Sequence, residues 1–170
     1  MAFYPLSRNV HHAGILRVTA APWHDVTLER AARRHLRALL TALDYVGVLA
    51  VEFFVRGGRL VANEMAPRVH NSGHWTIEGA ATSQFENHVR AVAGLPLGAT
   101  TPRGHAGMVN LIGAVPEKSP LLKLPDVHLH DYGKEPRPGR KVGHVTVVCA
   151  SRKERDAQLR RLLKALYPEL

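Results

Sequence analysis

The sequence predicts an α+β fold that is mostly antiparallel and divided into two unequal lobes. Apolar residues recur at helical spacing in three segments, whereas several shorter apolar segments are typical of strands. Two of these strands flank Arg56-Gly-Gly-Arg59, which signals a tight hairpin turn. The stretch Gly98–Gly104 interrupts these patterns and marks a boundary between two groups of elements.

The amino-terminal elements begin with two short strands, expected at Phe3–Leu6 and Gly14–Ala20 and joined by the polar turn Arg8–Gly14. Asp25 is a plausible N-cap, and a helix should run from it to about Leu43. Residues at helical spacing would form the buried stripe of this helix: Leu28, Ala32, Leu36, Leu39 and Leu43.

A hairpin follows, with strands expected at Gly47–Val55 and Leu60–Met65. The segment Ala66–His74 has no hydrophobic period and contains a proline and a glycine, so we expect a loop. A helix should then run from about Ser83 to Ala93, where the following glycine serves as C-cap and a nearby proline blocks continuation.

Beyond the boundary, strands are expected near Ala106–Val115, Val127–Tyr132 and Lys141–Ala150. A terminal helix from Ser151 to about Leu166 has a capping-box signature, serine followed three residues later by glutamate. The division therefore predicts one unit over residues 1–100 and a smaller unit over residues 101–170.

Composition narrows the class of protein without specifying its chemistry. With 170 residues the chain can form one ordinary domain or two small ones, and 45% hydrophobic with 22% charged residues argues against wholesale disorder. No apolar run approaches the roughly 20 residues that span a bilayer, and the start lacks the pattern of a secretory signal. The single cysteine, Cys149, reads as a buried inert thiol and fits a reducing cytosol. We expect a cytoplasmic protein with no membrane partner.

The charge balance is strongly basic. There are 23 Lys and Arg residues against 14 Asp and Glu, a formal net charge of +9, with 11 histidines besides. Such an excess attracts anions, including nucleic acids, phosphorylated metabolites and acidic surfaces. No basic stretch with interleaved aromatic residues accompanies it, so we expect no nucleic-acid partner. Much of the charge falls on predicted helices, as at Arg30–Arg37, where it would form a solvated outer face.

Two carboxylates on the predicted hairpin are candidates for metal binding. Glu52 lies inside a strongly apolar strand, and Glu64 ends the strand that returns beside it. Two unpaired carboxylates at that range repel each other, and a divalent cation removes this cost. Mg²⁺ is the usual cation where one or two carboxylates work with substrate phosphates. The alternative is that Glu52 forms a structural ion pair with a cation such as Arg68.

The loop after Glu64 concentrates polar side chains within seven residues. Such a density of hydrogen-bond donors beside a metal is what phosphoryl or acyl-phosphate chemistry requires. An ordinary surface loop is the alternative for any one of these residues. The set is Arg68, His70, Asn71, Ser72 and His74.

With these residues in view, the chain resembles the 5-(carboxyamino)imidazole ribonucleotide synthase family of ATP-grasp ligases. The resemblance covers nearly the whole chain in the same order, and the run Ala66–Gly79 is highly specific. The motifs that carry it are Tyr4–Leu6, Asn9–His11, Gly14–Leu16, Gly47–Val55, Asn63–Ala80, Thr82–Val92 and Gly139–Val145.

The resemblance implies a fold and a reaction. The fold would be the second half of an ATP-grasp module, an antiparallel sheet with helices, followed by a small β-rich carboxy-terminal domain. In the reaction of that family, ATP phosphorylates bicarbonate to carboxyphosphate. The amine of aminoimidazole ribonucleotide is then carboxylated in de novo purine biosynthesis, releasing ADP and phosphate. ATP is the co-substrate, and Mg²⁺ or Mn²⁺ is the implied metal.

The resemblance also implies roles for the site residues. Glu52 and Glu64 would be the metal ligands, and Asn63 with Glu64 would contact the nucleotide. Arg68, with its planar fork of donors, would hold bicarbonate or carboxyphosphate. The catalytic set would be Arg68, His70 and Asn71, and the substrate-binding set Ser72, His74, Lys134, Arg140 and Lys141. From the sequence alone, Lys134–Lys141 could equally be an ordinary solvated basic turn.

Two departures from the family pattern remain. Many ATP-grasp enzymes carry an asparagine ligand two positions after the second glutamate, where this chain has Ala66, a feature that the synthases share. Members also have an amino-terminal domain and a first half of the ATP-grasp module that are not represented here. We therefore expect a fragment that associates with the missing half or forms a homodimer. The alternative is a non-catalytic remnant or interaction module with residual phosphate or nucleotide binding.

Overall fold

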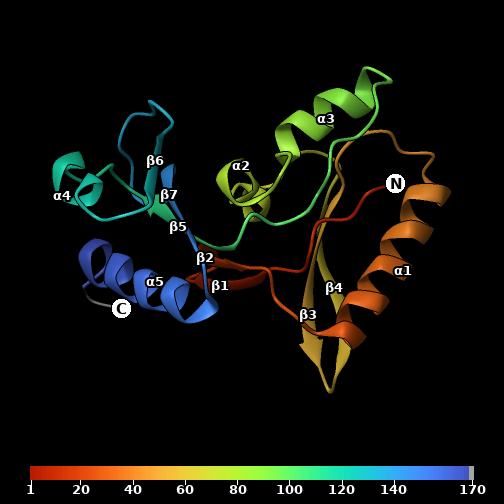
Figure 1. Ribbon diagram of the computed structural model, residues 1–170, viewed down its shortest axis with the longest axis horizontal. Coiled ribbons are helices and arrows are strands. Elements are labelled where there is room, and N and C mark those ends of the chain that lie inside the picture. The colour runs from red at the N-terminus through yellow and green to blue at the C-terminus, as the bar shows by residue number, and fades with distance from the viewer. Residues whose placement is uncertain (169–170) are drawn as a thin grey trace.

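The computed structural model describes residues 1–168 and contains a five-stranded antiparallel sheet and a separate two-stranded hairpin. The larger sheet has the order β1-β2-β5-β7-β6, and β3 pairs with β4. The large sheet and the hairpin lie on opposite sides of the molecule, with α1 beside the hairpin (Figure 1). The elements are β1 (Arg8–His12), β2 (Ile15–Ala21), α1 (Val26–Ala42), β3 (Ala50–Arg56), β4 (Arg59–Ala66), the 3₁₀ helix η1 (Asn71–Gly73), α2 (Thr76–Gly79), α3 (Gln84–Val92), β5 (His105–Ile112), α4 (Lys118–Leu122), β6 (Val127–Asp131), β7 (Lys141–Cys149) and α5 (Arg152–Leu166).

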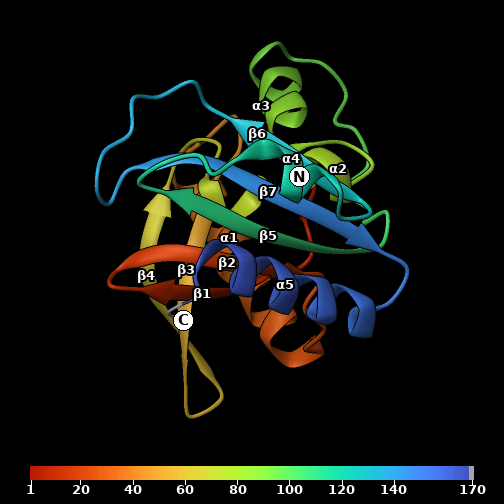
Figure 2. The ribbon, with the colours of Figure 1, turned by 90° about the vertical axis from the view of Figure 1, so that its left-hand side faces the viewer.

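The five-stranded sheet is packed on both faces. On one face, alternate residues of β5 and β7 pack against Leu159 and Leu162 of α5, which runs alongside these strands (Figure 2). Gly107 allows this close approach, because a Cβ there would lie 2.8 Å from the Leu159 side chain. On the other face, Trp75 packs with Met108 in a second cluster. The strands therefore have well-filled cores on both sides, as alternating side chains dictate.

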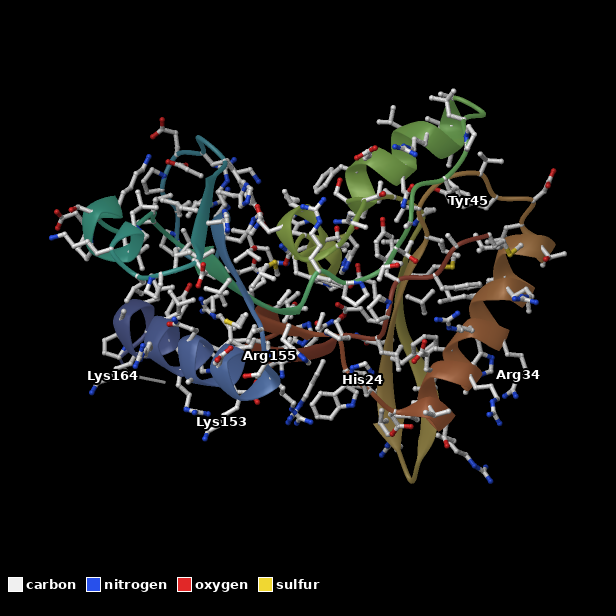
Figure 3. All side chains as sticks on the ribbon, in the orientation of Figure 1. His24, Arg34, Tyr45, Lys153, Arg155 and Lys164 are labelled. Atoms are coloured by element: carbon white, nitrogen blue, oxygen red, sulfur yellow. The ribbon has the colours of Figure 1, made fainter. Side chains whose placement is uncertain are left out.

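Helix α5 begins as the sequence predicts. Ser151 accepts a hydrogen bond from the Glu154 amide and Glu154 returns one to the Ser151 amide, so the capping box is confirmed. Arg155 points from α5 toward the end of β2, where it donates to the carbonyl of Ala21 (Figure 3). Other basic residues point outward from the molecule, including Arg34 on α1 and Lys153 on α5, as expected of a solvated charged face.

The predicted strand at Phe3–Leu6 is wrong. The first strand is Arg8–His12, within the predicted turn, and the chain reverses at Ala13 and Gly14, whose φ angles are 48° and 74°. The backbone of Phe3–Leu6 instead bonds to loops: the Leu6 carbonyl accepts from the Trp23 amide. The local pattern could not distinguish these registers, because both place polar residues near the turn.

The hairpin β1–β2 joins the five-stranded sheet through β5. Val18 of β2 pairs with Val109 of β5. The larger sheet thus contains strands from both sides of residue 100. The division into residues 1–100 and 101–170 remains a prediction about domain organisation.

Helix α1 is confirmed with its N-cap, since the Asp25 carboxylate accepts a hydrogen bond from the Leu28 amide. Its apolar stripe is less buried than predicted. Ala32 is buried, but Leu43 is 52% exposed because it forms the C-cap at the end of the helix. The remaining members of the stripe, Leu28, Leu36 and Leu39, are half-buried.

The hairpin β3–β4 and helix α3 are confirmed. Gly57 and Gly58 make the hairpin turn with φ angles of 55° and 73°. Ser83 caps α3 by accepting from the Glu86 amide. The predicted loop Ala66–His74 ends in η1, and α2 and α4 are short helices that the sequence patterns did not predict. Within residues 1–168, we find no helix with the length and hydropathy required to cross a bilayer.

A cavity of about 710 Å³ separates α1 from β3 and the amino-terminal segment. Its walls are largely apolar, with Leu36 contributed by α1 and Phe53 by β3. It extends to Glu52 and Asn63 on the hairpin. The apolar side of α1 therefore faces an incompletely filled space.

Candidate active site

Glu52 of β3 and Glu64 of β4 are direct partners in the register of the hairpin. The two carboxylates lie on adjacent strands as predicted, but the turn alone would pair Glu52 with Asn63, and the register shift after Glu52 makes Glu64 its direct partner. The Glu52 side chain is 11% exposed and that of Glu64 is 54% exposed. One carboxylate is thus held inside the fold while the other faces outward, and the register shifts immediately after Glu52.

His70 lies between the two carboxylates. Its Nδ1 is 3.9 Å from Glu52 Oε1, and its Nε2 is 3.8 Å from Glu64 Oε1. Nδ1 accepts a hydrogen bond from the Ser72 amide at 3.3 Å, which leaves the ring proton on Nε2, toward Glu64. Burial lowers the pKa of His70, although both carboxylates oppose this shift. A neutral imidazole therefore bridges the pair.

Two residues of β1 hold Glu52, and the sequence patterns assigned neither a role. Asn9 Nδ2 donates to Glu52 Oε1 at 3.4 Å, and Thr19 Oγ1 donates to Asn9 Oδ1 at 3.0 Å. His11 Nε2 lies 3.6 Å from Glu52 Oε2. Asn9 and His11 lie within a motif that carries the family resemblance, but their contact depends on the corrected position of β1.

The donor set suits a hard cation that also binds phosphate. In residues 1–168, no group of three or more His, Cys, Asp and Glu side chains could hold a metal ion unaided. Mg²⁺ usually takes one or two carboxylates and completes its shell with water and substrate phosphates. The paired oxygens of Glu52 and Glu64 fit that pattern. Within residues 1–168 no ion pair joins Glu52 to Arg68, whose guanidinium donates to the Val69 carbonyl at 2.9 Å, although His11 lies 3.6 Å from Glu52.

The loop that follows β4 is docked on a polar row across the five-stranded sheet. Asn110 of β5 pairs with His144 of β7, and His144 pairs with His130 of β6. Side chains of the loop and of α2 contact each member: Asn71 meets Asn110, His74 meets His144, and Glu78 of α2 meets His130.

The contact at Asn110 is an amide pair. Asn71 Nδ2 donates to Asn110 Oδ1 at 2.9 Å, and Asn110 Nδ2 donates back to Asn71 Oδ1 at 2.7 Å. Asn110 is fully buried and also donates to the Leu16 carbonyl. An asparagine inside an apolar strand was the available sequence signal, because a buried amide requires partners.

At the other end of the row, His144 is held in the neutral form by burial. The Tyr132 hydroxyl, whose pKa burial raises to about 12, is hydrogen-bonded to His144 Nδ1 at 2.7 Å. His144 is 1% exposed, and burial lowers its pKa to about 3, with His130 and His74 adding to the shift. His130 stacks on His144 at 4.3 Å and bonds to Glu78 at 2.6 Å.

The basic residues predicted to bind substrate, in the β6–β7 loop and at the start of β7, divide into two groups. Lys141 is close to the carboxylate pair: burial lowers its pKa, while the charges of Glu52 and Glu64 oppose the shift. Lys134 and Arg140 are exposed and reach main-chain oxygens of their own loop, at Lys141 and Glu135. The structure therefore brings Lys141 to the candidate site and leaves the other two on a solvent-exposed loop.

Comparison with known proteins shows the family to which this chain belongs. Residues 1–85, half of the chain, match the family model of the ATP-grasp domain. The chain belongs to the ATP-grasp family. Residues 106–158 match the model described as the phosphoribosylaminoimidazole carboxylase C-terminal domain. The resemblance inferred from the motifs is thereby confirmed, as is the antiparallel α+β ATP-grasp fold.

The relatives within the ATP-grasp family are N5-carboxyaminoimidazole ribonucleotide synthases. The Pseudomonas aeruginosa synthase is 55% identical over 157 residues, covering 92% of this chain and 43% of that protein. The crystal structure of the Thermus thermophilus synthetase, 57% identical, superposes with a TM-score of 0.94 over 99% of this chain and 47% of that one. The Aspergillus clavatus synthase in complex with ADP and 5-aminoimidazole ribonucleotide is 34% identical, with a TM-score of 0.87 over 96% of this chain and 47% of that one. The chain thus spans about half the length of the relatives that it matches.

Proposed function

We propose that this chain supplies the metal-binding and acceptor-binding half of an ATP-grasp ligase. The reaction would carboxylate 5-aminoimidazole ribonucleotide with bicarbonate, consuming ATP and giving ADP and phosphate. The observation that carries the proposal is the cross-strand pair Glu52 and Glu64 with neutral His70 between them. The synthases that this chain resembles add support, since one of them is described in complex with ADP and the ribonucleotide.

Glu52 and Glu64 would hold Mg²⁺, or Mn²⁺ in its place, against the nucleotide phosphates. The cation would neutralise the negative charge of the transferred phosphoryl group. Asn63, which precedes Glu64 on β4 and borders the cavity, would contact the nucleotide. Asn9 would keep Glu52 oriented through its hydrogen bond to Oε1.

Arg68 would hold bicarbonate or carboxyphosphate. One of its guanidinium nitrogens donates to the Val69 carbonyl, and the exposed remainder of the fork suits a planar anion. His70 would present its Nε2 proton near the metal-bound phosphate. Asn71 would have a positioning role, because its amide is already paired with Asn110.

The acceptor side would include Ser72, His74 and the basic loop. Lys141 lies beside the carboxylate pair and would attract a phosphate of the ribonucleotide or the nucleotide. Lys134 and Arg140 would join it when the ligand is bound, since both are exposed on the same loop.

We further propose that additional polypeptide, corresponding to the other half of the related synthases, covers the cavity beside α1. The largely apolar walls of the cavity support this, as does the coverage of about half of the relatives' length. A homodimer would be the other way to cover this surface. The single cysteine, which forms no disulfide, supports a cytoplasmic location.

The test is release of ADP in the presence of ATP, Mg²⁺, bicarbonate and aminoimidazole ribonucleotide. We expect no turnover by the chain alone. Turnover should appear when the amino-terminal half of the Pseudomonas aeruginosa relative is added, and Glu64→Gln should abolish it. Glu117→Gln, an exposed glutamate remote from the hairpin, is the matched control and should retain the activity.

Persistent silence in the presence of the added half would refute the catalytic proposal. It would favour the alternative, a non-catalytic module with residual phosphate or nucleotide binding. Calorimetric titration with ADP and Mg²⁺ would then distinguish a nucleotide-binding remnant from a chain with no such affinity.

A further inference from the structure

Gln84, the first residue of α3, makes an unusual set of hydrogen bonds with the candidate site. Its Oε1 accepts from the His70 amide at 3.0 Å, and its Nε2 donates to the His70 carbonyl at 2.7 Å. The same Nε2 lies 2.8 Å from Nδ1 of His74. The Gln84 side chain is buried, since the residue is 3% exposed, and the backbone amide of Gln84 donates to Thr76 Oγ1. One buried side chain therefore ties together both histidines of the loop.

These bonds determine the tautomer of His74. A backbone amide can only donate and a backbone carbonyl can only accept, so the two contacts to His70 fix which end of the Gln84 amide is oxygen and which is nitrogen. The atom facing His74 is consequently an N–H donor. His74 Nδ1 must accept from it, and the ring proton must be on Nε2.

We infer that Gln84 is a positioning residue that holds His74 as a neutral Nε2–H donor toward the acceptor substrate, beside Lys141. This rests on the proposed function for the identity of the ligand. The geometry of the Gln84–His74 contact is independent of it. Within residues 1–168, His74 Nε2 makes no hydrogen bond with the protein, so it is available to an oxygen of a bound phosphate or carboxylate.

The surroundings of His74 favour the same form. The groups that face it are His70, His130, His144, Tyr132 and Lys141. Burial lowers the pKa of His74 to about 4, and the charges of His70, His130 and Lys141 act in the same direction, whereas a hydrogen bond to the His70 backbone opposes the shift. A neutral donor beside cationic Lys141 adds a hydrogen bond to an anion without adding a second buried charge.

The loop is shaped to fit the Gln84 amide. A Cβ on Gly73 would lie 2.5 Å from Gln84 Oε1. Any side chain at this position would displace the amide from His70 or force the loop away from α3. Gly73→Ala therefore perturbs the same contact from the opposite partner.

The decisive measurement is long-range ¹H–¹⁵N correlation NMR of the histidine rings in the labelled 170-residue chain at neutral pH. The His74 signals, assigned by their loss in His74→Asn, should show a single tautomer with the proton on Nε2. A proton on Nδ1, or a mixture of tautomers, overturns the inference. This readout requires neither ligand nor turnover, so it is separate from the test of the reaction.

Gln84→Glu tests whether Gln84 is the cause. The carboxylate can accept from the His70 amide but cannot donate to His74, so His74 should gain a proton at Nδ1 and its titration midpoint should rise by about 1–3 pH units. Gly73→Ala should release the single tautomer without adding charge. Val92→Glu, at a position of α3 that is 58% exposed, is the control for an added carboxylate and should leave the His74 signals unchanged. Unchanged signals in Gln84→Glu would refute the inference.

In the completed enzyme, Gln84→Glu should lower kcat/KM at neutral pH by about 10–100-fold, the effect of losing one hydrogen bond to a charged ligand. The loss should grow as the pH rises through the His74 midpoint, because protonated His74 still donates from Nε2. The neutral ring instead keeps its proton on Nδ1, beside the introduced carboxylate, and turns an unprotonated Nε2 toward the anion. A merely structural defect would not follow pH in this way. If the tautomer is as inferred but the wild-type assembly has no activity, the proposed reaction fails and the positioning of His74 by Gln84 stands.

Discussion

The five-stranded sheet and the lobe formed by α1 with β3–β4 differ in how their apolar residues are buried. The sheet packs against α5 and Trp75 in two clusters, and residues such as Val145 and Leu162 are 0% exposed. No member of either cluster comes from residues 26–66. In that stretch Ala32 and Ala66 are the buried apolar residues, while Phe54 remains 57% exposed.

This difference shows that a sequence can specify regular helices and strands without also filling the space between them with a packed core. Helix α1 has a proper N-cap and the hairpin has its turn, yet a cavity of about 710 Å³ lies between them. Elements without a filled interface gain little from burial, which supplies most of the stability of a domain. The carboxylates proposed to bind the metal belong to the loosely packed lobe of α1 and β3–β4. The loop that would bind the acceptor is instead anchored on the well-packed five-stranded sheet.

The largest expected effect is the loss of stability in a matched pair of leucine-to-alanine variants, one in each region. Leu162→Ala, in the α5–sheet core, should lower the free energy of unfolding by about 2–5 kcal/mol. Leu36→Ala, on the wall of the cavity, should cost less than half as much, because its side chain is half-buried. Urea denaturation followed by circular dichroism measures both. Equal losses would mean that the two lobes share one equally packed core.

A second prediction concerns acid. His74 and His144 have pKa values lowered to about 4 and about 3 by burial, so the unfolded chain binds more protons than the folded one below about pH 6.5. Stability should therefore be fully present above pH 6.5 and fall toward pH 4, at about 1.4 kcal/mol per pH unit for each histidine.

Urea denaturation at pH values between 7 and 4 measures how the free energy of unfolding changes with pH. Comparison of variants identifies the histidine responsible. His144→Gln should flatten the pH dependence, whereas His24→Gln, at an exposed position before α1, should leave it unchanged. A slope that persists undiminished in His144→Gln would assign the acid sensitivity to other groups.

A third prediction tests whether the sheet holds the loop. Asn110→Ala removes the partner of the Asn71 amide and of the Leu16 carbonyl, and leaving such groups unpaired costs about 1–3 kcal/mol. The Asn71 side chain and its backbone amide should become more mobile, which hydrogen exchange would record. Asn87→Ala, a buried asparagine on α3 with different partners, controls for loss of any buried amide. Loop exchange that rises equally in both variants would contradict the proposed anchor.

The smallest expected effects are those of the helix caps. Ser151→Ala should cost about 1 kcal/mol of global stability, because α5 unfolds with the sheet core. Asp25→Ala removes an equivalent hydrogen bond from α1. We expect it to increase amide exchange within α1 while leaving the main denaturation midpoint almost unchanged. An equal shift of the midpoint in both variants would show that α1 unfolds together with the sheet.

The sequence by itself determined the elements whose signals are local. The capping box at Ser151, the N-cap Asp25 and the glycine turn between β3 and β4 are found where predicted, and the helix predicted from about Ser83 begins there. The same local reasoning placed Glu52 and Glu64 near each other on adjacent strands, whereas their direct pairing depends on the register shift after Glu52, which the turn does not specify. The family resemblance was also available, since the motifs that carry it are contiguous.

The tertiary structure decided what depends on residues far apart in the chain. It shifted the first strand to Arg8–His12, where Asn9 reaches Glu52, and it placed Asn110 beneath Asn71 and Gln84 against His74. Each of these contacts joins segments that strand pairing and packing bring together. The hydrogen-bonding capacity of a side chain does not by itself indicate which distant residue it will contact. Burial likewise depends on what covers a surface. The apolar residues of α1 have helical spacing, but they face a cavity, whereas those of α5 pack against the sheet.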